Sequence, residues 1–224
     1  MRNKIMDPIG KLMGLRYKSH PWHGIDPGPD APHLMTAYIE MVPTDTVKYE
    51  ADKSSGYLRI DRPQKYSNVI PALYGFFPQS YCGEKVGKYC SKMTERKQIK
   101  GDADPLDVCV LTERTISHGD ILAHVIPIGG FRMIDGNMAD DKIIAVLKND
   151  AGYGHYKNID DVPSAVLERL KHYFLTYKDI PGNNDRVSEI THTYGAEEAF
   201  KVIEFALEDY HHRFDSLESV LDKV

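Results

Sequence analysis

The chain has 224 residues, which fits one large domain or two small ones, and we expect a single domain over residues 1–224. Hydrophobic residues make up 42% and charged residues 27%, with Pro and Gly scattered, so disordered, collagen-like and coiled-coil classes are disfavoured. The net charge is -5, from 28 Lys and Arg against 33 Asp and Glu, which argues against a nucleic-acid binder. At first sight it also argues against any polyanionic ligand.

The cysteines and apolar runs bear on the compartment. Cys82, Cys90 and Cys109 are an odd number without a Cys-x-x-Cys pair, which disfavours a disulfide framework and favours a reducing compartment. Charged residues interrupt the apolar residues of 1–13, so we expect no secretion signal there. The purest apolar run, 143–147, is far shorter than the ~20 residues of a membrane span. We therefore expect a cytoplasmic protein with no membrane partner.

In chain order, an irregular arm comes first and strands follow it. Residues 1–33 become rich in proline near their end, which predicts an irregular N-terminal arm with Trp22 as a packing anchor. Within residues 34–150, short β-type runs are bounded by Pro, Gly, Asp and Asn, at 35–41, 47–51, 57–60, 108–111, 121–128 and 142–147. Alternation in the second run puts Lys48 and Glu50 on one face, typical of a half-buried strand.

Two helices are predicted within residues 163–212. Apolar residues recur at spacings of three and four over 166–177, with Pro163 near the first turn, and again over 199–210. Two glutamates precede the second run, where a helix N-terminus favours negative charge. Strands followed by helices, without β-α-β alternation, indicate a barrel or curled sheet with helices packed on it. The predicted fold class is mainly β with packed α-helices.

A long connection extends over residues 78–100 and is mostly basic. Only two glutamates offset its six basic residues, Lys85, Lys88, Lys92, Arg96, Lys97 and Lys100. Loops of this length are usually functional or mobile. Two interpretations stay open, a lid near an anion and a solvated surface excursion.

An acidic turn at 101–107 leads into an apolar run. In an extended chain Asp102 and Asp104 share a face, and Asp107 joins them only if the chain bends, which Pro105 allows. Converging carboxylates repel one another unless a hard divalent cation neutralises them, which points to Mg²⁺, Mn²⁺ or Ca²⁺. The alternative is a solvent-facing acidic turn. The spacing is not that of an EF-hand loop.

A second acidic turn covers residues 135–142 and also leads into a strand. It contains Asp135, Asp140 and Asp141. Two such turns, each beside an apolar strand, would supply four or five carboxylates to a metal cluster if they met at one end of a barrel. A polar hairpin loop is the alternative.

Cationic and phenolic groups recur beside these turns. Each has an ordinary structural explanation: Lys178 would complement a helix C-terminus, Arg62 would pair with its neighbour Asp61, and Tyr74 would lie in the core. Isolated histidines lack the spacing of zinc sites, and a zinc site at Cys82 and Cys90 is disfavoured against free thiols.

Taken together, these motifs resemble the soluble, Mg²⁺-dependent inorganic pyrophosphatases of the barrel type (family I). The Asp-x-Asp-Pro-x-Asp pattern at 102–107 looks like that family's signature. The other motifs stand in the expected order, at 38–43, 47–50, 61–62, 74–75, 135–142 and 177–179. The resemblance covers about 34–179, and residues 20–23 are similar to a stretch of the eukaryotic-type branch.

The resemblance implies a five-stranded OB-like β-barrel flanked by C-terminal helices, and hydrolysis of inorganic diphosphate to two phosphates. It implies several Mg²⁺ ions per active site, with Mn²⁺ as a substitute, and homo-oligomers, either dimers or hexamers. The implied metal ligands are Asp102, Asp107, Asp140, Asp135, Glu40 and Glu50. Asp104 would accept a proton from the attacking water, with Tyr74 near the nucleophile. The implied phosphate-binding residues are Lys48, Arg62, Tyr74, Lys142, Tyr177 and Lys178.

The chain departs from the family pattern at two positions. Ala103 replaces a glycine or small polar residue, so we expect strain if that position needs a positive φ. Ile70 stands where the family usually has a second active-site tyrosine, which removes one hydrogen bond.

Two rival functions remain to be tested. A non-catalytic module, either an OB-type nucleic-acid binder or a Ca²⁺-stabilised domain, is the first, although the predicted strand ends carry carboxylates rather than stacking aromatics. The second is another Mg²⁺ phosphohydrolase acting on nucleotides. For a small anion that arrives with Mg²⁺, the acidic excess becomes part of the binding site, so net charge argues only against nucleic acid.

Overall fold

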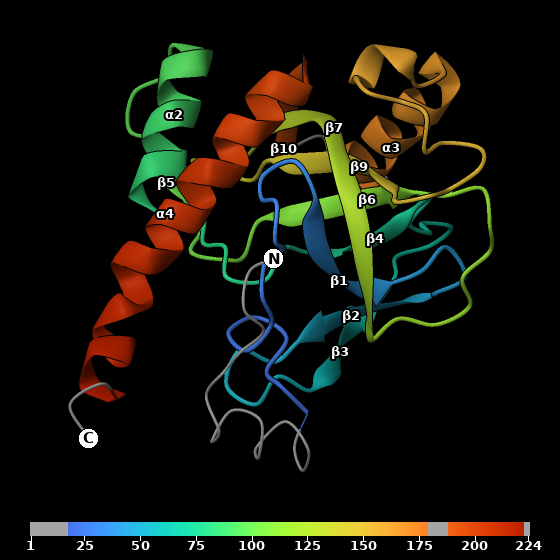
Figure 1. The fold of residues 1–224 in the computed structure, drawn as a ribbon. Helices are drawn as coiled ribbons and strands as arrows, with labels where there is room; N and C mark the ends of the chain where they lie inside the picture. Colours follow the sequence, from blue (N-terminus) through green and yellow to red (C-terminus); the bar gives the residue numbers. More distant parts are fainter. Residues whose placement is uncertain (1–17, 179–187, 222–224) are drawn as a thin grey trace.

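The computed structural model describes residues 18–178 and 188–221, with side chains of the last helix described as far as Phe214. The strands are β1 (Met35–Met41), β2 (Val47–Ala51), β3 (Leu58–Pro63), β4 (Leu73–Phe76), β5 (Lys100–Gly101), β6 (Asp107–Leu111), β7 (Ile121–Asp135), β8 (Met138–Ala139), β9 (Lys142–Leu147) and β10 (Ser188–Gly195). The helices are α2 (Glu84–Thr94), α3 (Ser164–Thr176) and α4 (Ala196–Leu221), with a short 3-10 helix at Ile159–Asp161. Figure 1 shows α2 and α4 side by side on one flank of the sheet and α3 on the other.

Five strands close into a ring, which confirms the predicted mainly-β barrel with packed helices. The ring runs β1, β4, β6, β9, β7 and back to β1. All of its pairs are antiparallel except β6 with β9, which are parallel. β2 and β3 form a separate two-stranded sheet, and β10 pairs with the far half of the long strand β7.

Strands β6 and β9 are buried on both faces. Val108 and Ile143 pack in a cluster that also takes in apolar residues of α2 and α4. Their neighbours Cys109 and Ile144 pack in a second cluster, with residues of α3 such as Phe174. Because successive side chains of a strand point to opposite faces, burial on both faces gives the continuous apolar runs seen in the sequence. All three cysteines are free and buried.

Several predicted element boundaries match, and four strands were not predicted, β4, β10 and the two-residue strands β5 and β8. The runs at 35–41, 47–51 and 142–147 are confirmed at both ends, and the run at 121–128 extends to Asp135 in β7. β4 was not assigned as a strand. β10 lies between α3 and α4, so the predicted order of strands first and helices last is wrong at this point. α4 also continues past residue 212, the predicted end of the helical region.

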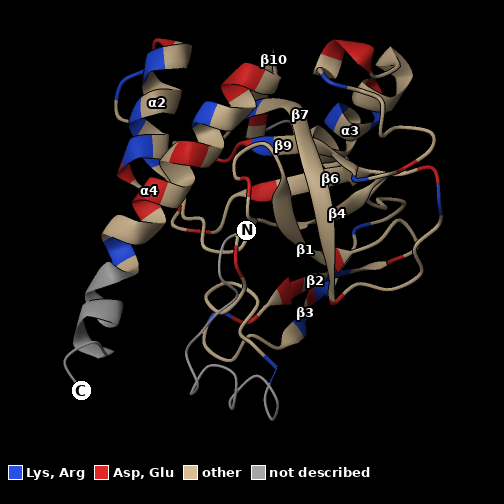
Figure 2. Ribbon diagram, in the orientation of Figure 1, with Lys and Arg blue, Asp and Glu red and all other residues tan. Residues whose placement is uncertain are grey.

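The expectation of a long loop over residues 78–100 is wrong, because its middle part is helix α2. Val86 and Cys90, one helical turn apart, are buried against the core. The basic side chains face outward, where Lys88 pairs with Glu84, Lys85 with Glu208 and Arg96 with Glu189. Figure 2 shows charged residues of both signs spread along α2 and α4.

The N-terminal arm is irregular over its described part, residues 18–33, as expected. Trp22 has only 6% of its surface exposed, and its Nε1 donates a hydrogen bond to the Ser80 carbonyl at 2.7 Å. Its ring meets Phe214 of α4 edge to face, with centroids 5.6 Å apart. Trp22 therefore anchors the arm, as predicted. The stretch 1–13, in which no secretion signal was expected, lies outside the described residues.

The N-terminus of α2 is capped by a residue of α4. The capping residue Gly83 has no side chain, and Asp209 takes its place. The Asp209 carboxylate accepts hydrogen bonds from the backbone N–H groups of Gly83 (3.1 Å), Lys85 (2.9 Å) and Val86 (3.1 Å). The two helices are thus joined by charge as well as by apolar contact. In the ranges 18–178 and 188–221, no helix has the length and apolar character needed to cross a bilayer.

We predict that Asp209→Asn lowers the free energy of unfolding by about 1–2 kcal/mol, because the first turn of α2 loses a carboxylate acceptor. Urea denaturation followed by circular dichroism measures the change. Glu208→Gln is the matched control, because Glu208 makes only an exposed pair with Lys85, and its expected effect is close to zero. Equal losses in the two variants would contradict the capping role.

Candidate active site

The two acidic turns meet because the strands that they enter are parallel neighbours. Residues 102–106 lead into β6, and residues 136–141 lead into β9. Parallel strands begin at the same edge, so both turns lie at one end of the barrel. The register pairs Asp107 with Lys142 at the first position of the two strands. The predicted convergence of the two turns is therefore a feature of the structure.

A cavity of about 260 Å³ opens at this end of the barrel. The structure places every predicted site residue along its wall. The predicted metal ligands there are Glu40, Glu50, Asp102, Asp107, Asp135 and Asp140. The predicted phosphate-binding residues are Lys48, Arg62, Tyr74, Lys142, Tyr177 and Lys178. The predicted proton acceptor, Asp104, lines the same cavity. The roles of these residues stay predictions. None of the basic residues of 78–100 lines the cavity, which favours the surface interpretation of that segment.

Backbone hydrogen bonds hold the first acidic turn in shape. The N–H of Asp104 donates to Oδ1 of Asp102 at 3.0 Å. The N–H of Ala103 donates to the Cys82 carbonyl at 3.0 Å, and the N–H of Cys82 donates to the Asp104 carbonyl at 2.8 Å. A Cβ at Gly101 would lie 2.0 Å from the same Cys82 carbonyl, so only glycine fits there. The turn is thus fixed against the segment that precedes α2.

Ala103 adopts the left-handed conformation, with φ of +66°. The expectation of strain at this position is therefore confirmed, since an L-residue with a Cβ pays roughly 1 kcal/mol in this region. The conformation turns the chain between Asp102 and Asp104, so that both side chains reach the cavity.

Lysine ammonium groups lie between the carboxylates of the cavity. Lys142, only 3% exposed, contacts Asp107 and lies 2.5 Å from Oδ1 of Asp140. Lys178 contacts Asp135, and Lys53 contacts Asp104. Within the described part of the chain, acidic, His and Cys side chains form no group of three or more that is close enough to hold a metal ion in this arrangement. The carboxylates are balanced by lysines instead.

Two carboxylates of the cavity are buried deeply enough to resist ionisation. Burial raises the pKa of Glu40 to about 8, although its Oε1 accepts a hydrogen bond from the Ala51 N–H at 2.6 Å. Burial, and then the charge of Asp140, raises the pKa of Asp102 to about 8. Such groups favour a nearby cation, because a positive charge restores the ionised form. A wall of carboxylate oxygens fits a hard cation such as Mg²⁺, Mn²⁺ or Ca²⁺.

Cationic and phenolic side chains from other elements also line the cavity. Lys48 and Arg62 face each other across the β2–β3 pair, and Lys48 Nζ lies 3.2 Å from Oδ2 of Asp61. The Arg62 guanidinium lies 5.9 Å from the ring centroid of Tyr177, which stacks on Tyr173 at 5.3 Å. Arg62 makes the ordinary ion pair with Asp61 that was considered for it, and Lys178 pairs with Asp135; both basic residues line the cavity.

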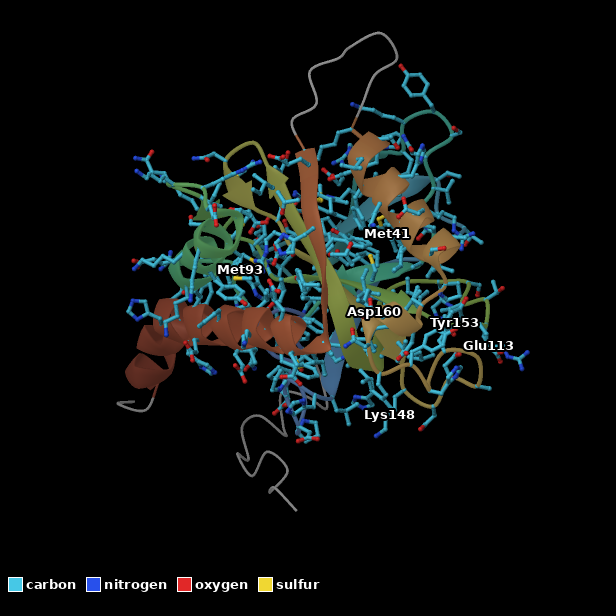
Figure 3. The ribbon with its side chains drawn as sticks, turned by 90° about the horizontal axis from the view of Figure 1, so that it is seen from above. Met41, Met93, Glu113, Lys148, Tyr153 and Asp160 are labelled. Carbon is cyan, nitrogen blue, oxygen red and sulfur yellow. The ribbon has the colours of Figure 1, made fainter. Side chains whose placement is uncertain are left out.

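Sequence reasoning missed some residues of the cavity, Lys53 above all. Lys53 lies in the turn between β2 and β3, where Oδ1 of Asp52 accepts hydrogen bonds from the hydroxyls of Ser54 (2.6 Å) and Ser55 (2.7 Å). This Asp-Lys-Ser-Ser turn was the available signal. Met41 also lines the cavity and lies beside α3 in Figure 3. Ile70 is buried in the core beneath α3 and does not reach the cavity.

Comparisons with known proteins agree with this geometry. The family model described as inorganic pyrophosphatase matches residues 37–211. An inorganic pyrophosphatase of Chlamydia caviae is 50% identical over 87% of this chain and 92% of its own length, and a soluble inorganic pyrophosphatase of rice (Oryza sativa) is 32% identical over 86% and 79%.

Solved structures give the same result. The crystal structure of the inorganic pyrophosphatase of Thermus thermophilus superposes with a TM-score of 0.70 and 26% identity, over 86% of this chain and 99% of that one. The match of the family model and the identity to curated relatives both cover most of the chain. The chain therefore belongs to the inorganic pyrophosphatase family and is an inorganic diphosphatase.

Proposed function

We propose that the chain hydrolyses inorganic diphosphate through a water molecule that Mg²⁺ activates and Asp104 deprotonates. The observation that carries the proposal is a cavity lined by carboxylates and cationic side chains that alternate in space, because Lys142, Lys178 and Lys53 each contact an aspartate of the cavity. Diphosphate is a compact polyanion whose phosphorus atoms are shielded by their own oxygens, so its hydrolysis needs charge neutralisation from both sides.

The carboxylates that line the cavity would hold the metal ions. The proposed ligands are Glu40, Glu50, Asp102, Asp107, Asp135 and Asp140, with Mn²⁺ as a substitute for Mg²⁺. When bound, Mg²⁺ lowers the pKa of a water molecule and neutralises phosphate charge. Asp107 is central to this set, because it begins β6 and shares Lys142 with Asp140. An ammonium that already lies between two carboxylates supports a cation site at that place.

Asp104 is suited to accept a proton. Its side chain is 43% exposed, lines the cavity and contacts Lys53 there. A carboxylate that is not enclosed by ligands keeps oxygen atoms free to orient a water molecule. Ala103 turns the chain between the two aspartates, so Asp104 contacts Lys53 whereas Asp102 accepts a backbone hydrogen bond. Different partners of this kind would separate proton transfer from metal binding.

The cationic and phenolic side chains that line the cavity would bind and orient the phosphates. Arg62 offers a planar fork that suits a phosphate in a bidentate manner, whereas Lys48 and Lys178 act as point charges. Tyr177 and Tyr74 add hydroxyl groups for hydrogen bonds. Lys142, which lies between Asp107 and Asp140, would supply a further positive charge for the phosphates.

We further propose that the chain forms a single catalytic domain, acts in the cytoplasm and assembles as a homo-oligomer. Three buried, free cysteines suit a reducing compartment. Tyr57 (76% exposed), just before β3, and Ile60 (65%), within it, are exposed apolar side chains of this hairpin, which suits contact with a second copy. Size-exclusion chromatography with light scattering measures the assembly.

The first prediction concerns the substrate. Phosphate release measured by a colorimetric assay should be fast with diphosphate and roughly 100-fold slower with ATP or a phosphomonoester, because a cavity of about 260 Å³ rich in charged groups suits a compact polyanion better than a nucleotide. EDTA should abolish the release and Mg²⁺ should restore it. Absence of metal-dependent release from diphosphate would overturn the proposed function.

The second prediction separates the roles of two aspartates. Asp104→Asn should lower kcat by roughly 100-fold or more, with little change in Mg²⁺ affinity, because it removes a proton acceptor and not a ligand. Asp107→Asn should lower both. Mg²⁺ titrations of activity and of calorimetric heat measure the two quantities. Small and equal effects in the two variants would contradict this division.

The third prediction concerns Lys53, which is half exposed and reaches the cavity from the β2–β3 turn. Lys53→Ala should raise KM for diphosphate roughly fivefold, or about 1 kcal/mol, because a point charge is lost beside a polyanion. Steady-state kinetics at saturating Mg²⁺ give KM. The control is Lys88→Ala on α2, whose lysine pairs with Glu84 outside the cavity and should leave KM unchanged. An unchanged KM in Lys53→Ala would exclude substrate contact.

A further inference from the structure

A charged cluster lies buried behind the second acidic turn. Its centre is Arg132 of β7, whose side chain is 0% exposed. Nη1 lies 2.7 Å from Oδ2 of Asp141, and Nη2 donates to Oε1 of Glu198 at 2.6 Å. The Tyr194 hydroxyl donates to the same Oδ2 of Asp141 at 3.1 Å. We call these four residues, together with Tyr89, the buried arginine cluster.

Aromatic rings flank the guanidinium of Arg132. Its Cζ lies 5.0 Å from the ring centroid of Tyr89 and 5.0 Å from that of Tyr194. The cluster therefore joins α2, through Tyr89, and α4, through Glu198, to the barrel strand β7. Asp141 is its only member that belongs to the second acidic turn.

The cluster is not arranged for maximal stability. Nε of Arg132 and Oδ1 of Asp141 are buried and have no hydrogen-bond partner among the described residues, and Nη1 meets Asp141 as an ion pair without hydrogen-bond geometry. A buried ion pair with unpaired polar atoms is commonly less stable than apolar side chains of similar volume. Such a pair is therefore better explained by what it holds in place than by the stability it adds.

Asp141 stands between two residues of the cavity. Asp140 and Lys142 line the cavity, whereas Asp141 is directed to the cluster, as expected where the chain enters β9 and successive side chains alternate. The N–H of Asp140 also donates to the carbonyl of Met133, the neighbour of Arg132, at 3.0 Å. The turn is thus held to β7 by the β7–β8 pairing and this further backbone bond, and the ion pair of Asp141 with Arg132 is its side-chain link to β7.

We propose that Arg132 is a positioning residue, which acts through Asp141 to set the places of Asp140 and Lys142 in the cavity and thereby sets its affinity for Mg²⁺. This inference rests on the proposed function. Arg132 touches neither the substrate nor the metal, because the cluster lies behind the cavity wall. Supporting groups of this kind typically change metal affinity by roughly 10-fold to 100-fold when they are removed.

The test measures Mg²⁺ binding to the purified full-length chain by calorimetry, without diphosphate. Arg132→Met should raise the Kd for Mg²⁺ roughly 10-fold or more, because the buried Asp141 loses its countercharge and the turn shifts. Arg132→Lys keeps the charge but loses the planar fork, and its shift should be smaller. Asp150→Asn is the control, because Asp150 accepts hydrogen bonds from Thr112 and Tyr153 beyond the other ends of β6 and β9, away from the cavity, and its Kd should stay within twofold of the wild-type value.

A double variant separates positioning from folding. Arg132→Met combined with Asp141→Asn removes both charges, so it should unfold at a higher urea concentration than Arg132→Met alone. The Kd for Mg²⁺ should nevertheless stay at least 10-fold above the wild-type value, and this double variant also serves if Arg132→Met does not fold. Recovery of the wild-type Kd in the double variant, or an equal rise in Asp150→Asn, would overturn the inference.

The wild-type chain supplies the reference that separates this inference from the proposed function. If the wild type binds Mg²⁺ and hydrolyses diphosphate but the Arg132 variants bind Mg²⁺ equally well, only the positioning role fails. If the wild type shows no Mg²⁺-dependent hydrolysis, the proposed function itself fails.

Discussion

The site depends on the parallel pairing of β6 with β9, in a barrel whose other ring pairs are antiparallel. Parallel neighbours begin at the same edge of a sheet, so the turns that precede them stand side by side. The register then sets the contact in detail, because it places Asp107 opposite Lys142. If one of the two strands slipped by one residue, its side chains would turn to the other face. Asp107 and Lys142 would then no longer point to the same side of the sheet.

The crowding of carboxylates at this end creates a cost that the rest of the site offsets. Burial makes ionisation of Glu40 and Asp102 unfavourable, and lysines from three different elements approach their neighbours. The same surroundings that disfavour bare carboxylates favour a divalent cation. An overall charge of -5 therefore says little about the local field, because the acidic groups that matter are gathered at one place beside lysines and an arginine.

The helices stabilise this end of the barrel from outside. α4 caps α2 through Asp209 and reaches the barrel through Glu198, while α3 covers the opposite flank and ends beside Tyr177 (Figure 1). The second acidic turn is consequently supported by groups from remote parts of the chain. Rigid support of this kind matters in a polyanion site, because small displacements of charged groups change their interaction strongly.

The sequence by itself determined the fold class and most of the ring strands, because alternation and apolar runs depend only on neighbouring residues. The acidic and cationic residues of the cavity, apart from Lys53, were expected from the resemblance of the ordered motifs to a known family. The sequence did not reveal β4, which has four residues and a glycine, or β10, whose strand pattern is interrupted by polar residues and whose pairing with β7 is remote. Helix α2 was hidden because its apolar face is narrow among many lysines. Only the tertiary structure decided that the two acidic turns meet, that Lys53 joins them and that Arg132 lies behind them, because these contacts join residues far apart in the chain and follow from strand register.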